Sequence, residues 1–128
     1  YSFEISTELA NYAKNLLSKN NIRNVDVRNA SIDKELVNLL NEIEKIDLVY
    51  FDANHTEEAT IRYFKICLEK AHADSVFIFD DINWSQGMKR AWKRIKKDER
   101  VKISIDLFRM GIVFFREGIV KQDFVIRF

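Results

Sequence analysis

The sequence contains no proline, only three glycines and a single cysteine among its 128 residues. Gly87, Gly111 and Gly118 are too far apart for a G-x-G-x-x-G turn, so the chain carries no phosphate-binding loop of that type. A lone cysteine excludes an internal disulfide, and the apolar residues around Cys67 favour a buried helical thiol. No run of about 20 apolar residues is present, which excludes a transmembrane span and favours a soluble domain.

An excess of charge of either sign is also missing, because 21 Lys and Arg balance 20 Asp and Glu. The net charge of +1 gives no general attraction to nucleic acid or to an anionic membrane, so neither partner is expected. Basic residues do cluster on the helix predicted at 86–97, but no aromatic side chains alternate with them. A solvated outer face is therefore the favoured interpretation of that cluster. No signal segment opens the chain, so a cytoplasmic location is expected.

What the sequence does contain is a repeated alternation of strand and helix patterns. Apolar residues at i, i+3, i+4 and i+7 spacing predict amphipathic helices, and short apolar β-prone runs predict strands between them. Strands are predicted at 1–5, 25–27, 46–51 and 75–79, and helices at 6–20, 33–44, 56–72 and 86–97. Residues 101–108 and 112–116 predict an antiparallel hairpin, and 124–128 an edge strand or a tail. The alternation indicates an α/β fold with a doubly wound, mostly parallel sheet.

The same spacing predicts which side chains are buried. One face of the first helix is apolar and consists of Leu9, Tyr12, Ala13, Leu16 and Leu17. The run 46–51 is nearly continuous in apolar residues, as expected of a parallel strand that is buried on both faces. Three aromatic side chains are large enough to line a substrate pocket, but core packing is the favoured use of each: Tyr63, Trp84 and Phe108.

Polar residues gather where the predicted parallel strands end. The carboxyl ends of such strands meet at one edge of the sheet, where α/β proteins bind their ligands. We therefore expect four polar clusters to converge there. They are Glu4, Asn29-Ala30-Ser31, the segment from Asp52 to His55, and Asp80-Asp81 with the residues that follow.

The chemistry of this edge is open on the residues alone. Asp52, Asp80 and Asp81 suit a hard divalent cation such as Mg²⁺, but one of them can equally cap the following helix while another faces solvent. His55 is a candidate general base, a candidate metal ligand or a polar loop residue. Glu4 can accept both hydroxyls of a ribose, although a surface glutamate at a strand end would have the same position.

Four sequence segments also carry a resemblance. They are Tyr1-Ser2-Phe3-Glu4-Ile5, Asn29-Ala30-Ser31, Asp47-Leu48-Val49-Tyr50-Phe51-Asp52 with His55, and Val76-Phe77-Ile78-Phe79-Asp80-Asp81. Their order and spacing resemble the class I S-adenosylmethionine-dependent methyltransferases, most closely the small-molecule O-methyltransferase branch that includes the catechol O-methyltransferase type. The resemblance implies a Rossmann-like fold, with residues 1–128 as the C-terminal part of a single methyltransferase domain.

The resemblance also implies an activity of the EC 2.1.1 type, the transfer of a methyl group from S-adenosylmethionine to a small-molecule acceptor, by preference at oxygen. Glu4 would bind the ribose hydroxyls, with Ala30 and Ser31 beside the adenine. Asp52 would contact the cofactor and take part in catalysis. Together with Asp80 and Asp81 it would also bind Mg²⁺. In the metal-dependent branch of the family the residue at the place of Asp81 is commonly asparagine, and in the metal-free members His55 would be the base.

One part of the family pattern is missing from the chain. The first strand and the Gly-rich loop come before the segment that begins at Tyr1, and that strand lies between those ending at Glu4 and Asp52. The chain is therefore expected to be a fragment that is truncated before its first strand, is inactive and binds the cofactor poorly. Its two exposed strand edges are expected to pair or swap with another copy.

Two other classes of function are weighed against this one. A Mg²⁺-dependent phosphotransfer domain of the receiver type also has an aspartate after such a strand, but its acidic pair precedes that strand and Asp80-Asp81 follows it. A non-catalytic binding module or remnant domain keeps the sheet without the cofactor loop. The absence of a Gly-rich loop is compatible with that alternative.

Overall fold

A computed structural model describes residues 1–127 and divides into two compact units, Tyr1–Glu42 and Ile43–Phe128. We refer to them as the first and the second unit and describe each by itself. The order of elements is that of an α/β chain, in which strands and helices alternate up to the fourth helix and three further strands follow. The α/β class and the strand-helix alternation predicted from the sequence are confirmed.

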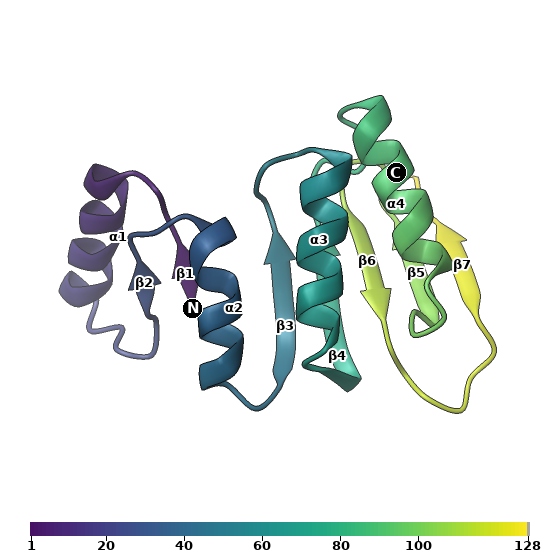
Figure 1. Ribbon diagram of the computed structural model, residues 1–128, viewed down its shortest axis with the longest axis horizontal. Helices are drawn as coiled ribbons and strands as arrows, with labels where there is room; N and C mark the ends of the chain where they lie inside the picture. The colour runs from purple at the N-terminus through teal and green to yellow at the C-terminus, as the bar shows by residue number, and fades with distance from the viewer. Residues whose placement is uncertain (128) are drawn as a thin grey trace. The chain divides into compact units, whose positions relative to one another are not determined.

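The first unit contains two strands and two helices (Figure 1). Strands β1 (Ser2–Phe3) and β2 (Val27–Arg28) pair in parallel, and helices α1 (Thr7–Lys19) and α2 (Ile32–Glu42) follow them. The hydroxyl of Ser6 accepts a hydrogen bond from the backbone N–H of Leu9 at 3.3 Å and so caps α1, as the sequence predicts. The second strand is displaced by about one residue from the predicted 25–27.

The apolar face predicted for the first helix does not face a core. Ala10 is the buried residue of α1, whereas Leu9 is 55% exposed, Tyr12 67% and Leu16 49%. The prediction of an inward face was therefore wrong for these side chains. The physical reason is that two-residue strands offer too little sheet surface to cover a helix of 13 residues.

The second unit is a five-stranded sheet in the order β3-β4-β6-β5-β7. Its strands are β3 (Ile46–Phe51), β4 (Ala71–Phe79), β5 (Ile103–Asp106), β6 (Gly111–Phe114) and β7 (Gln122–Val125). β3 and β4 are parallel, β6 is antiparallel to β4 and β5, and β7 runs parallel to β5. Helices α3 (Glu57–Leu68) and α4 (Gln86–Lys97) lie side by side over one face of this sheet (Figure 1).

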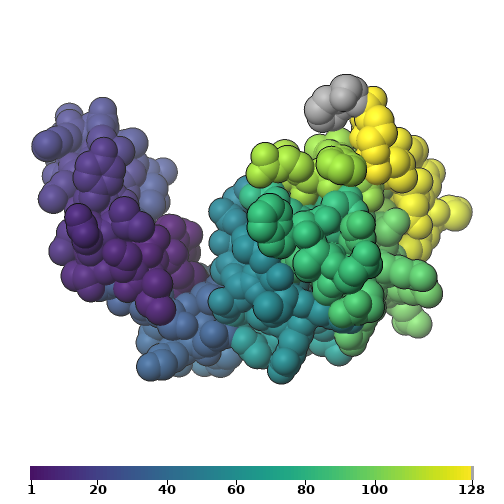
Figure 2. Space-filling view, turned by 90° about the horizontal axis from the view of Figure 1, so that it is seen from above, coloured from purple at the N-terminus to yellow at the C-terminus, as the bar shows by residue number. Residues whose placement is uncertain are grey.

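Aromatic rings form the core of the second unit, whose atoms pack as one continuous body from teal to yellow in Figure 2. The ring centroids of Phe51 and Phe79 are stacked 4.6 Å apart, and Phe77 contacts Phe115 edge-to-face at 4.8 Å. The thiol of Cys67 is buried in this unit, and burial raises its pKa to about 12. The predicted helical, buried cysteine is confirmed.

Three boundaries differ from the predictions. Helix α3 ends at Leu68 rather than at 72, because β4 begins at Ala71 and pairs there with Ile46. His72, the last residue of the predicted helix, lies in β4 instead, and its backbone N–H donates to the hydroxyl of Ser75 at 2.8 Å. The hairpin of β5 and β6 is confirmed. The C-terminal strand is an edge strand that spans Gln122–Val125, two residues earlier than the predicted start at 124. The last residue of the predicted range 124–128 lies outside the described residues.

Strand β3 is an edge strand, since among residues 1–127 it pairs with β4 alone, and β1 likewise pairs with β2 alone. Both strands therefore have an open edge, but β1 has two residues, so only the edge of β3 has the length that the sequence predicts. Ile46 and Phe51 are the buried residues of β3, whereas Leu48 is 61% exposed, so the prediction that this strand is buried on both faces was wrong. Among the described helices, none is both long and apolar enough to span a bilayer.

Candidate functional site

The acidic residues of the second unit come together at the carboxyl ends of β3 and β4. Asp52 follows β3 directly, and Asp80 and Asp81 follow β4. The two strands are in parallel register to their last residues, and the backbone N–H of Asp80 donates to the carbonyl of Phe51 at 3.0 Å. The predicted convergence of these two clusters is confirmed. The helix caps are Thr56 and Ser85, so the alternative in which one of these aspartates caps the following helix is wrong.

His55 lies between two of these carboxylates. Its Nε2 is 3.2 Å from Asp52 Oδ1, and its Nδ1 is 3.9 Å from Asp81 Oδ2. The first distance permits a hydrogen bond and the second is too long for one. The left-handed backbone of Asn54, with φ 56°, turns the chain between strand and helix so that His55 lies over the strand end. Asp52 therefore orients the imidazole and leaves Nδ1 toward the edge.

Tyr50 belongs to the same edge, although sequence reasoning did not select it. Partial desolvation, a hydrogen bond to Asp80 and the charges of Asp80, Asp52 and Asp81 raise the pKa of the phenol above its ordinary value. The carboxylate of Asp80 also accepts from the backbone N–H of Asp81 at 2.9 Å. The alternation of a strand could have revealed Tyr50, because it lies opposite to the buried Phe51 in a strand that ends in aspartate.

Arg109 is the second residue that sequence reasoning missed. Its guanidinium lies 3.7 Å from Asp81 and is 76% exposed. It belongs to the turn of the β5–β6 hairpin, which is hydrogen-bonded to the segment after β4. The backbone N–H of Ile82 donates to the carbonyl of Arg109 at 2.9 Å, and Asn83 Nδ2 donates to the carbonyl of Phe108 at 2.7 Å.

Two of the three aromatic residues considered for a substrate pocket are exposed. Trp84 is 74% exposed and Phe108 is 60% exposed, so the prediction that they pack in the core was wrong. Tyr63 is 1% exposed and packs in the core as predicted. Trp84 is the third residue after Asp81, and its backbone N–H donates to the carbonyl of Asp81 at 2.9 Å.

The arrangement of carboxylates does not fit the predicted metal. Within residues 1–127, no group of three or more His, Cys, Asp or Glu side chains is arranged to hold a metal ion. Asp80 is engaged by Tyr50 and by a backbone N–H, while Asp52 and Asp81 face His55. The assignment of Mg²⁺ to Asp52, Asp80 and Asp81 is thus a prediction without support in the structure.

In the first unit, Glu4 and Ala30 lie together at the carboxyl ends of β1 and β2. The backbone N–H of Ala30 donates to the carbonyl of Glu4 at 3.1 Å, and Glu4 Oε1 accepts from the backbone N–H of Ser6 at 2.7 Å. Ser31 precedes α2, and its carbonyl accepts from Lys34 and Glu35. The second carboxylate oxygen of Glu4 has the capacity to accept a further hydrogen bond.

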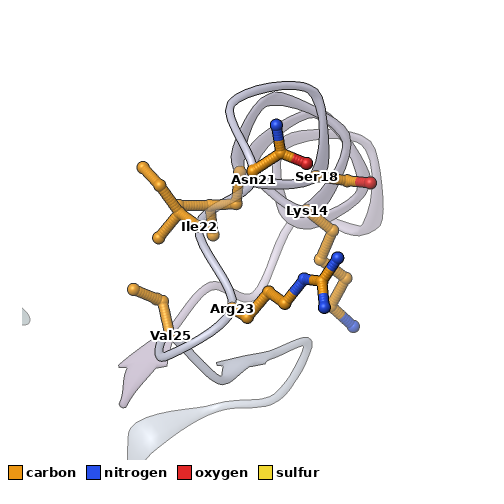
Figure 3. Close-up of a pocket in the computed structure, with 7 residues that line it drawn as sticks. Lys14, Ser18, Asn21, Ile22, Arg23 and Val25 are labelled. Atoms are coloured by element: carbon orange, nitrogen blue, oxygen red, sulfur yellow. The ribbon is translucent and has the colours of Figure 1, made fainter.

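The first unit also contains a shallow pocket of about 260 Å³ (Figure 3). It lies between α1 and the segment before β2, where the side chains of Lys14 and Arg23 extend on the same side. None of the predicted site residues lines it. The pocket is therefore separate from the strand ends at which the predicted residues gather.

Comparison with known proteins agrees with the resemblance in the sequence. A family model described as a methyltransferase domain matches residues 1–82, which is more than half of the chain. A search of curated protein sequences found no significant match.

Solved structures resemble this chain in fold. An SAH-bound methyltransferase from Podospora anserina has a TM-score of 0.71 and 14% identity, over 90% of this chain and 59% of that one. An SAH-bound O-methyltransferase from Bacillus cereus has a TM-score of 0.66 and 20% identity, over 88% and 60%. A putative O-methyltransferase from Klebsiella pneumoniae has a TM-score of 0.71 and 15% identity, over 89% of this chain and 60% of that one. The chain thus spans about three fifths of the length of these structures.

Proposed function

This chain belongs to the methyltransferase domain family, and from that premise we propose that it serves S-adenosylmethionine-dependent methyl transfer to an oxygen of a small-molecule acceptor. The observation that carries the proposal is the position of His55 at the carboxyl edge of the second unit. Asp52 holds its Nε2, and Nδ1 is left without a hydrogen bond to either neighbouring carboxylate. This is the arrangement of a general base with an orienting carboxylate.

The proposed reaction needs a deprotonated acceptor. His55 Nδ1 accepts the proton of the acceptor hydroxyl while Asp52 fixes the other ring nitrogen as the donor. The imidazolium formed in this way lies between the carboxylates of Asp52 and Asp81, which stabilise its charge. When bound, S-adenosylmethionine supplies a sulfonium methyl group, whose C–S bond breaks with the electron pair leaving on sulfur as the O–C bond forms. The residues contribute orientation and proton transfer, and no step requires a metal.

We propose that the residues that bind the cofactor are those that the resemblance implies. In the first unit, Glu4 would accept the ribose hydroxyls, with Ala30 and Ser31 beside the adenine. In the second unit, Asp52 would lie next to the transferred methyl group. We further propose that residues 1–128 are the C-terminal part of one methyltransferase domain, and that the chain alone is inactive. The chain spans about three fifths of the solved structures, which supports the proposal that it is part of a domain.

The first test is a pair of histidine variants in the complete enzyme that contains this chain. His55→Gln is expected to lower kcat by about 10²–10⁴-fold, because general base catalysis is lost. His72→Gln is the matched control, since His72 Nε2 lies 2.9 Å from Asp47 and forms a second exposed His–Asp pair, at the start of β4. It is expected to leave kcat unchanged. Equal losses in both variants, measured as S-adenosylhomocysteine release, would contradict the role of His55.

The second test is calorimetric titration of the chain itself with S-adenosylhomocysteine. Only weak binding is expected, because the sequence contains no Gly-rich loop. The matched variant is Glu4→Gln, which should weaken any residual binding further, whereas Glu8→Gln on the exposed side of α1 should not. Sub-micromolar affinity of the unmodified chain would refute the proposal that it is an inactive part of the domain.

A non-catalytic binding domain is the second candidate, and the scarcity of glycine favours it. The two candidates differ in what the edge residues do. In a binding domain, His55→Gln would alter ligand affinity without a reaction to inhibit. A complete enzyme that binds S-adenosylhomocysteine and transfers no methyl group to any acceptor tested would favour this candidate.

A further inference from the structure

We propose that the free edge of β7 is an interaction surface for a second copy of this chain, in which the two β7 strands pair antiparallel about a two-fold axis. Strand β7 ends the sheet on the side away from β3, and among residues 1–127 it pairs with β5 alone (Figure 1). The edge is apolar as well as open, because Phe124 is 45% exposed, Val125 62% and Ile126 46%. The strand contains neither lysine nor proline, the residues that commonly protect such an edge from pairing.

The backbone groups at this edge belong to alternate residues. The N–H groups of Gln122 and Ile126 donate to carbonyls of the segment 102–106 at 2.8 and 2.9 Å, so these two residues face β5. Along a strand, successive residues direct their N–H and C=O groups to opposite sides. The groups that face the open edge are therefore those of Asp123, Val125 and Arg127.

Charge selects one register of self-pairing. With Val125 opposite its own copy, the outward backbone groups of the two strands meet in hydrogen-bonded pairs, and Asp123 of each chain lies opposite Arg127 of the other. Opposite charges in such cross-strand positions stabilise the pairing. Any other register separates these charges. The one that places Val125 opposite Asp123, for example, brings Lys121 opposite Arg127, where like charges repel.

Apolar side chains meet in the same register. Phe124 of each copy lies opposite Ile126 of the other, on both sides of the two-fold axis. These are the non-hydrogen-bonded positions of the antiparallel ladder, where opposite side chains approach most closely. A pair of an aromatic and a β-branched side chain is favourable in such positions. The register selected by charge therefore also covers the exposed apolar residues of the edge.

Contacts within the chain hold the two charges at this edge. Asp123 accepts a hydrogen bond from the hydroxyl of the buried Ser104, and Arg127 Nη1 lies 3.1 Å from Asp106 Oδ1. A carboxylate can accept several hydrogen bonds and a guanidinium has five donors, so both groups can also bind across the interface. Their positions are set before a second copy arrives, which lowers the entropic cost of the pairing.

The edge of β3 is also open but is less suited to self-pairing. Within the stretch 46–52 the charged residues are Asp47 and Asp52, both negative, so no register of this stretch brings opposite charges together. The ladder of β3 with β4 also shifts register between Ile46 and Leu48, and such irregularities disfavour the addition of a further strand. Self-complementarity thus assigns the second copy to β7.

The first test is sedimentation equilibrium of the chain from about 1 μM to 1 mM. Two short edge strands bury less surface than the roughly 1,200–2,000 Å² of stable complexes, so we expect a reversible dimer with a Kd of about 10–100 μM. Val125→Pro removes an outward N–H and leaves the ladder with β5 intact, and it should raise the Kd at least about 10-fold. Val120→Pro, at an exposed valine before β7, and Leu48→Lys, at the edge of β3, should leave the Kd unchanged.

The second test exchanges the charges. Asp123→Lys and Arg127→Asp should each weaken the dimer at least about 10-fold, because like charges then face each other across the interface. An equimolar mixture of the two variants should recover the Kd of the unmodified chain, since each introduced charge meets an opposite one. Mixing cannot restore the contacts with Ser104 and Asp106 that each variant loses within its own chain, so recovery assigns the effect to the pairing between copies.

Four results would overturn the inference. They are a monomer at every concentration, a dimer that Val125→Pro leaves unchanged, a dimer that Leu48→Lys abolishes, and a mixture of the charge variants that associates as weakly as each variant alone. The third result would place the interface at β3 instead. None of these measurements involves a methyl donor, so the test of His55 is unaffected by their outcome.

Discussion

The two units of this chain are built from similar sequence patterns but differ in how they bury them. In the second unit, aromatic rings from β3, β4 and α3 contact one another, and Phe77 is fully buried. In the first unit, α1 has one buried residue, Ala10, and exposes Leu16 by 49%. An amphipathic pattern therefore fixes the type of an element, while burial depends on how much surface the neighbouring elements offer.

This difference has a consequence for stability. Apolar burial is the dominant favourable term in folding, so the second unit can maintain its structure through its own core. The first unit combines short strands, helix caps and ion pairs such as the one between Arg28 and Glu42 with a smaller set of buried residues, most of them leucines of α2. Substitutions in the aromatic core should therefore lower the free energy of unfolding far more than substitutions on the exposed face of α1.

The largest expected effect is that of Phe77→Ala. Phe77 is fully buried and contacts the rings of Phe51, Phe64 and Phe115, so the truncation should lower the free energy of unfolding by about 3–5 kcal/mol. The matched variant Leu16→Ala in α1 should change it by less than about 0.5 kcal/mol. Urea unfolding checks both, with Trp92 fluorescence for the second unit and circular dichroism for helix α1. Similar losses in the two variants would remove the difference between the units.

A smaller effect is expected within the second unit, at its glycines. A Cβ added to Gly111 would lie 2.7 Å from the ring of Trp92, which is buried. Gly111→Ala should therefore cost about 1–3 kcal/mol of unfolding free energy and shift the Trp92 emission. Gly87→Ala, where the nearest atoms are 3.5 Å away inside α4, should stabilise by about 0.4–1 kcal/mol. If Gly111→Ala left the free energy of unfolding unchanged, α4 and the sheet would be packed more loosely than the contact between Gly111 and Trp92 indicates.

Much of this arrangement could be predicted from the sequence, and what could not be predicted has physical causes. Helix types followed from spacing and capping residues such as Ser6, because those signals are local. The exposure of Leu48 and Trp84 could not be predicted, since it depends on which strands pair and where a loop projects. The edge residues Asp52, Asp80 and Asp81 were found because strand ends are local signals. Tyr50 could have been found from the alternation of β3, whereas Arg109 could not, because its contact with Asp81 comes from the position of the hairpin turn.

The smallest expected effect concerns the ion pair of the first unit. The hydrogen bond from Arg28 to Glu42, at 3.0 Å between Nη1 and Oε1, holds the pKa of the Glu42 carboxyl below its ordinary value of 4.5. Because the folded pKa is depressed, the ion pair stabilises the first unit above the unfolded pKa, and this stabilisation is lost as the pH falls through the folded pKa.

Helix α2 should therefore lose stability on acidification in the unmodified chain and show a flatter pH dependence in Glu42→Gln. Arg28→Lys should behave like Glu42→Gln, since an ammonium cannot make the bidentate contact. Carboxyl NMR titration gives the pKa of Glu42, and circular dichroism below pH 5 gives the unfolding profile, with about one pH unit on either side of the transition sampled. A pKa of Glu42 at or above 4.5 would show that the first unit is held together by its few buried residues and not by this pair.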